Sequence, residues 1–92
     1  MKLVRDRIPE LFGYSKLKIA NDEEYERALN EKLKEEVNEF VESKNIEELA
    51  DILEVVQAIA ENNGSDFKEI LEMKEKKAEV RGRFSKKQLW KG

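Results

Sequence analysis

The chain contains no cysteine and no histidine among its 92 residues. Without cysteine, disulfide bonds and thiolate metal sites are excluded. Without histidine, imidazole ligands and histidine acid–base catalysis are excluded as well. Any metal site must therefore use oxygen ligands, which favour hard cations such as magnesium, manganese or calcium.

Helix-breaking residues and long apolar runs are also scarce. The sequence has one proline and four glycines, and no stretch is long and apolar enough to span a bilayer. The N-terminus lacks the apolar run of a signal peptide, so we expect a cytoplasmic location. The net charge of −3 offers no overall attraction to nucleic acid or to an anionic membrane.

What the chain does contain is a high content of mixed charge. Charged residues make up 42% of the sequence and hydrophobic residues 39%, which is typical of helices with solvated faces. The length indicates a single domain over residues 1–92. The composition suits helices, and the apolar fraction, low for a self-sufficient monomer, leaves room for a core shared between subunits. We therefore predict an all-α fold whose helical bundle is completed by oligomerisation.

Hydrophobic periodicity predicts a long antiparallel helical hairpin at the centre of the chain. Residues 22–42 form the first helix, and Asn21 with Glu24 resembles a capping box at its start. A break at residues 43–45 follows, and Asn45 is the expected cap of a second amphipathic helix. So short a connection favours antiparallel packing of the two helices.

Two further helices are predicted to flank this hairpin. A last helix is expected over residues 66–81, with Ser65 as its cap. A brief helix is expected within residues 3–12, for which Asp6 is a candidate cap.

Two carboxylate pairs, Glu36/Glu39 and Glu48/Asp51, lie on the two hairpin helices at i,i+3 spacing. Residues three apart on a helix project in similar directions, and both pairs lie near the connected end of the hairpin. Glu36 also falls on the apolar stripe of its helix, where a charge loses hydration and needs compensation. Four carboxylates at close range repel one another unless a cation neutralises them. We therefore predict that these four residues bind Mg²⁺, with Mn²⁺ as an alternative.

A non-catalytic interpretation of the same residues stays open. A chain this rich in charge produces acidic i,i+3 pairs by chance, and Glu48 is also a possible capping-box partner of Asn45. On that interpretation the chain is a helical interaction module whose acidic residues form a solvated face. A calcium sensor is less favoured, because the sequence has no D-x-D-x-D-G loop.

Basic residues continue the apolar stripe of the last helix at Lys74, Lys77 and Arg81. Lys32 lies one turn before Glu36 on the first hairpin helix. Lysine and arginine beside a magnesium–carboxylate cluster suit a polyphosphate substrate, so these four cations are predicted substrate contacts. The alternative is that they are solvated or ion-paired residues.

The acidic pattern resembles a known family signature. The segments Glu35-Glu36-x-x-Glu39 and Glu48-x-x-Asp51 resemble the EExxE…ExxD motif of the MazG-type all-α nucleotide pyrophosphatases. Three further blocks, at residues 2–10, 48–55 and 76–84, resemble the small phosphoribosyl-ATP-pyrophosphohydrolase-like branch.

The resemblance implies hydrolysis of the α–β phosphoanhydride of a nucleoside triphosphate to the monophosphate and pyrophosphate, in a house-cleaning role. It implies a magnesium ion held by Glu36, Glu39, Glu48 and Asp51, and assembly of helical bundles as a homodimer or homotetramer. Glu35 and Glu39 are the candidate catalytic residues that accept a proton from the attacking water. Phosphoribosyl-ATP hydrolysis in histidine biosynthesis is the alternative activity.

The chain departs from the resembled pattern after Arg81-Gly82. A second glycine is expected there, but the chain has Arg83. This departure bears on the tail rather than on the predicted metal site.

Overall fold

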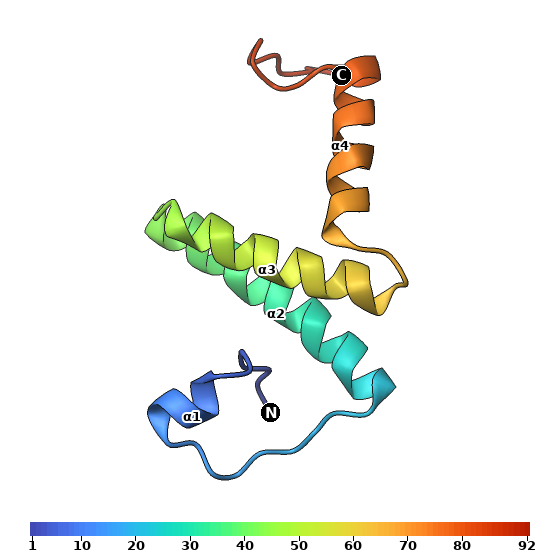
Figure 1. The fold of residues 1–92 in the computed structure, drawn as a ribbon. Coiled ribbons are helices and arrows are strands. Elements are labelled where there is room, and N and C mark those ends of the chain that lie inside the picture. The colour runs from blue at the N-terminus through green and yellow to red at the C-terminus, as the bar shows by residue number, and fades with distance from the viewer.

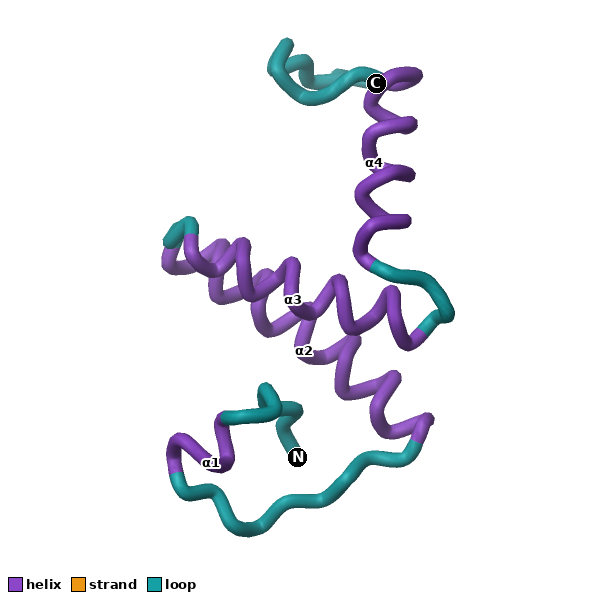
Figure 2. Tube along the Cα trace, viewed as in Figure 1, coloured by secondary structure: helices purple, strands orange, loops and turns teal.

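A computed structural model describes residues 1–92 and contains four α-helices and no strand (Figure 2). The helices are α1 (Ile8–Phe12), α2 (Asp22–Ser43), α3 (Glu47–Asn62) and α4 (Phe67–Arg81). The predicted all-α class is therefore confirmed. Helices α2 and α3 pack side by side as the expected hairpin, while α4 leaves its open end (Figure 1). None of the four helices combines the length and apolarity needed to cross a membrane.

The start of α2 follows the predicted capping box. The Asn21 side chain accepts a hydrogen bond from the Glu24 amide at 2.9 Å, and the Glu24 carboxylate accepts one from the Asn21 amide at 3.1 Å. Two amides that lack partners within the helix are thereby satisfied.

The end of α2 lies one residue beyond the predicted boundary. There Lys44 adopts a left-handed backbone conformation (φ 57°), and its amide donates to the Phe40 carbonyl at 2.7 Å. This conformation is uncommon for a residue with a side chain. It reverses the chain between Ser43 and Glu47 and returns α3 along α2.

The starts of α3 and α4 differ in part from the predicted caps. Ile46 rather than Asn45 occupies the cap position of α3 and makes no side-chain cap hydrogen bond. The Asn45 side chain, one residue earlier, accepts from the Glu47 amide at 3.0 Å, but Glu48 returns no hydrogen bond to it, so the capping-box role of Glu48 is wrong. Asp66 rather than Ser65 caps α4, accepting from the Glu69 amide at 2.8 Å. The Ser65 hydroxyl instead donates to the Glu69 carboxylate at 2.6 Å.

The short helix α1 also begins later than its predicted cap. Arg7 occupies the capping position without a side-chain hydrogen bond, and Pro9 lies in the first turn. Asp6 therefore does not cap α1. Gly13, with φ 71°, ends the helix in the left-handed conformation that glycine favours.

The core of the single chain is thin. Four residues are buried, three of them apolar: Leu29 on α2, and Val55 and Ala60 on α3. Many large apolar side chains remain exposed on the hairpin, among them Val41 and Leu53. No residue of α4 is buried: on its predicted core-facing line Phe67, Ile70 and Ala78 are half-buried, whereas the basic residues Lys74, Lys77 and Arg81 are exposed.

Shortening the most buried apolar side chain is expected to destabilise the hairpin. Leu29 is 2% exposed, so Leu29→Ala should lower the free energy of unfolding by about 2–3 kcal/mol, the low end for core leucines because this core is small. Leu53→Ala, at a site that is 50% exposed, is the matched control and should cost well under half as much. Urea unfolding measures both variants. An equal cost would show that Leu53 is covered in solution.

Candidate metal centre

Five carboxylates gather where the two hairpin helices face each other near their connection. Carboxylate oxygens of Glu36, Glu48 and Asp51 lie within 4.8 Å of one another. Oxygens of Glu35, Glu36 and Glu39 form a second group with the same spacing. Glu36 belongs to both groups, so the other three predicted metal ligands, Glu39, Glu48 and Asp51, and the predicted catalytic Glu35 each share a group with it.

Glu36 is the buried member of this cluster. It is 7% exposed and is the sole charged residue of the chain that is buried. Its place on the stripe with Leu29 and Leu33, predicted from helical periodicity, is confirmed, since Leu29 is buried and Leu33 half-buried. Lys32 offers partial compensation, with its Nζ 3.4 Å from a Glu36 oxygen.

The pKa values of two cluster members reflect crowding of negative charge. Burial, followed by the charge and hydrogen bond of Glu39, raises the pKa of Glu36 above its usual range, against the opposing effect of Lys32. Burial, a hydrogen bond to Asp51 and the charge of Glu39 raise the pKa of Glu48. Without a cation, ionisation of both groups at neutral pH therefore works against the folded state.

Cations from the N-terminal segment lie against the edge of the cluster. The Arg5 guanidinium donates to Asp51 at 2.7 Å, joining residues 46 positions apart, and the Lys2 amine lies 2.9 Å from Glu35. Lys32 also contacts Glu35, at 3.3 Å. The resemblance of the block at residues 2–10 implies that Arg5 borders a nucleotide pocket, but nothing in the sequence indicated that Lys2 would reach Glu35.

These contacts distinguish the surroundings of the two predicted proton acceptors, Glu35 and Glu39. The hydrogen bond from Lys2, with a further one from Lys32, lowers the pKa of Glu35 despite some desolvation. Glu39 is exposed and makes no ion pair. Glu35 is thus held by two lysines, while Glu39 is left available.

The structure places the basic residues of α4 away from the cluster. Helix α4 follows the end of α3 that is remote from Asp51, about 16 Å along the helix axis at 1.5 Å per residue (Figure 1). Gly64, with φ 77°, forms part of the turn that directs α4 away from the hairpin. Within one chain, Lys74, Lys77 and Arg81 are therefore not brought to the carboxylates.

The tail residue that departs from the family pattern has a defined partner. The Arg83 guanidinium lies 2.7 Å from Glu75, and Lys74 lies 2.9 Å from the same side chain. Hydrogen bonds from Arg83 and Lys74 lower the pKa of Glu75 to about 2. Arg83 and Lys74 thus engage a carboxylate of their own segment.

The donor set fits a hard divalent cation. Glu36, Glu48 and Asp51 would hold it, with Glu39 adjacent, and all of these offer oxygen, the ligand that Mg²⁺ prefers. A buried glutamate among like charges has the most to gain from such a cation, since the single ion pair from Lys32 leaves its pKa raised.

The raised pKa values predict an unusual pH dependence of stability in metal-free protein. A carboxyl group whose folded pKa exceeds its unfolded value of 4.5 contributes stability below that pH, and the contribution is lost as pH rises through the folded pKa. Groups with a lowered pKa, such as Glu35, have the opposite effect on stability: their contribution is lost as pH falls, and only below pH 4.5. The metal-free Tm should therefore fall as pH rises from 4.5 towards neutrality.

Thermal melts with a chelator, and with millimolar Mg²⁺, measure this effect. Magnesium should raise the Tm more near neutral pH than near pH 5, because the carboxylates bind the metal only when ionised. A metal-free Tm that rises towards neutral pH would contradict the expectation.

Comparisons with known proteins found no protein-family model, no curated protein and no solved structure that matches this chain. The resemblance to the MazG-type pyrophosphatases thus depends on the motifs in the sequence.

Proposed function

We propose that this chain is a magnesium-dependent nucleoside-triphosphate pyrophosphohydrolase with a house-cleaning role. It would cleave the α–β phosphoanhydride and release the monophosphate and pyrophosphate. The observation that carries the proposal is the convergence of Glu36, Glu48 and Asp51 within 4.8 Å, from two helices, around a buried carboxylate. The EExxE…ExxD pattern adds independent support for this reaction class.

The close carboxylates repel one another, which favours binding of a cation, and the helix backbone holds them in place. Glu36 and Glu39 are fixed by α2, and Glu48 and Asp51 by the first turns of α3. Ligands on regular helices are held more accurately than ligands on loops, and such preorganisation benefits catalysis. When bound, Mg²⁺ would polarise the phosphate oxygens and lower the pKa of an attacking water.

Glu39 is the preferred proton acceptor in this proposal. It lies in the cluster, is exposed to water and has no competing ion pair. Glu35 has a lowered pKa because Lys2 and Lys32 hydrogen-bond its carboxylate, which makes it a weaker base. Glu35 instead holds these two lysines beside the cluster, where they are placed to contact an anionic substrate.

Of the cations predicted to contact substrate, Lys32 is the one that lies at the carboxylates. Lys74, Lys77 and Arg81 would reach the phosphates only from a second copy, in the homodimer or homotetramer that we propose as the assembled form. The exposed apolar side chains of the hairpin support such an assembly.

A substrate panel tests the function. Pyrophosphate release and monophosphate formation should be measured with canonical, deoxy and damaged nucleoside triphosphates, with Mg²⁺ and with chelator. We expect magnesium-dependent turnover of at least one of them. Turnover of phosphoribosyl-ATP alone would favour the histidine-pathway activity. No turnover, together with no magnesium binding, would favour a non-catalytic helical module.

A further inference from the structure

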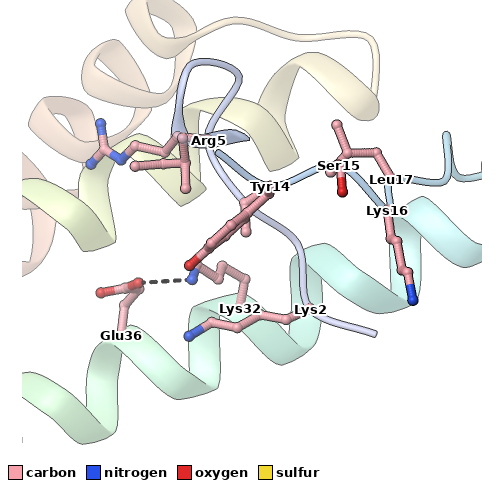
Figure 3. Close-up of a pocket in the computed structure, with 10 residues that line it drawn as sticks. Lys2, Arg5, Tyr14, Ser15, Lys16, Leu17, Lys32 and Glu36 are labelled. Carbon is pink, nitrogen blue, oxygen red and sulfur yellow. Dashed lines mark ion pairs between the residues drawn. The ribbon is translucent and has the colours of Figure 1, made fainter. Parts of the chain in front are cut away.

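A pocket of about 690 Å³ lies between the N-terminal segment, the segment after α1 and helix α2 (Figure 3). Its volume is in the range of about 300–1,000 Å³ that small-molecule sites occupy. The polar and aromatic side chains that line it are Lys2, Arg5, Tyr14, Ser15, Lys16, Lys32 and Glu36. Three aliphatic side chains, Val4, Ile8 and Leu17, complete the wall.

The charge of this pocket opposes that of the whole chain. Four cations and one carboxylate line it, a formal excess of three positive charges, whereas the chain carries −3. Lys32 is half-buried, which strengthens its electrostatic effect. Lys16 makes no ion pair. A ligand with several negative charges is the chemical complement of this pocket.

The pocket is continuous with the carboxylate cluster. Glu36 lines the pocket and also belongs to both carboxylate groups. Lys2 and Arg5 line it too, while pairing with Glu35 and Asp51 at the cluster edge. A ligand that fills the pocket therefore has its anionic part between the basic wall and the candidate metal centre, an arrangement suited to a phosphate chain.

Tyr14 gives the pocket an aromatic surface. The hydroxyl end of the ring is directed towards Lys32 and Glu36 (Figure 3), and the residue is 54% exposed. Every nucleobase has a flat π face that can stack on such a ring. The pocket thus combines a basic wall for phosphates with a ring for a base.

We infer that this pocket is the subsite for a nucleoside polyphosphate. Lys2, Arg5 and Lys32 contact the phosphates beside Glu36, Lys16 adds positive charge on the far side of the pocket, and Tyr14 stacks on the base. The inference rests on the proposed function for the reaction that follows binding. It keeps Lys32 from the sequence prediction but locates the other phosphate contacts at the N-terminal segment and the segment after α1 rather than at α4. The half-exposed Arg5–Asp51 pair leaves Arg5 able to exchange partners at little cost.

Calorimetric binding of two probes tests the pocket. α,β-Methylene ATP retains the base but resists cleavage at the α–β position, and inorganic triphosphate lacks the base; both are titrated with Mg²⁺. Lys16→Glu should weaken both probes about tenfold or more, because it reverses a charge in the pocket. Lys34→Glu, an exposed and unpaired lysine of α2 outside the pocket, is the matched control and should change either affinity less than about threefold.

The base contact is tested by two variants of Tyr14. Tyr14→Ala should weaken α,β-methylene ATP about tenfold while leaving triphosphate binding nearly unchanged, whereas Tyr14→Phe should bind both probes normally. Circular dichroism and Tm confirm that each variant is folded.

Several outcomes would overturn the subsite: no binding of either probe by wild-type protein, equal affinities for Lys16→Glu and Lys34→Glu, or loss of binding by Lys77→Glu but not by Lys16→Glu. If Lys77→Glu alone lost binding while wild type released pyrophosphate, the subsite would fail and the proposed function would stand. If the expected variant effects appeared without any pyrophosphate release, the subsite would stand and the proposed function would fail.

Discussion

Replacing Asp51 by asparagine is expected to lower both magnesium affinity and kcat/KM by about 100-fold or more, while the helices stay intact. Asparagine keeps the size of the side chain but removes one of the three charged oxygen donors that converge on the site. The Arg5–Asp51 ion pair is lost as well. Because both partners are half-exposed, that loss should cost at most about 1 kcal/mol of stability.

Magnesium titration calorimetry and pyrophosphate release measure the effect of Asp51→Asn, and circular dichroism verifies the helices. Glu54→Gln is the matched control, since Glu54 is an exposed acid one turn further along α3 and outside both carboxylate groups. It should behave as wild type. Unchanged magnesium affinity in Asp51→Asn would contradict the metal centre, whatever happens to the activity.

Replacing Glu36 by glutamine is expected to move stability and activity in opposite directions. At neutral pH the metal-free Tm should rise by about 4–8 °C, the shift that about 1 kcal/mol produces in a domain of this size. The raised pKa means that the Glu36 charge opposes folding once pH exceeds that value. Glutamine removes the charge, and its amide can donate to Glu39 while its oxygen faces Lys32.

The same substitution should abolish magnesium binding and pyrophosphate release, because Glu36 belongs to both carboxylate groups. It should also flatten the decline in metal-free Tm towards neutral pH. Glu31→Gln, at an exposed acid of α2 outside both carboxylate groups, is the control and should leave all three properties unchanged. A fall in the Tm of Glu36→Gln at neutral pH would show that the Glu36 charge stabilises the folded chain, and would contradict the expected destabilising effect of this charge.

The hairpin and the burial of Glu36 were accessible from the sequence because both depend on local, periodic information. The Asn21–Glu24 capping box is encoded within four residues. The inward position of Glu36 follows from its spacing to Leu29 and Leu33 at 3.6 residues per turn. Such features need no knowledge of how distant segments pack.

The features that the sequence did not predict depend on backbone angles or on non-periodic segments. Ser65 and Asp66 are both good caps, and their backbone geometry selects Asp66. The direction of α4 follows from the turn at Gly64, which separates its basic residues from the carboxylates. No periodicity marks the residues around Lys2 or Tyr14, so their place beside Glu36 is a tertiary property.

Lys44 lies in the shortest connection between two helices of this chain. That connection sets how the Glu48/Asp51 pair of α3 is rotated relative to the Glu36/Glu39 pair of α2. Only residues 44–46 separate Ser43 from Glu47, and the left-handed conformation of Lys44 fixes where α3 begins. One inserted residue that extended α3 would rotate its remaining side chains by about 100° and shift them by about 1.5 Å. Glu48 and Asp51 would then turn away from Glu36. Connections usually tolerate changes of length best, but in this hairpin the length of the connection determines whether the two carboxylate pairs face each other.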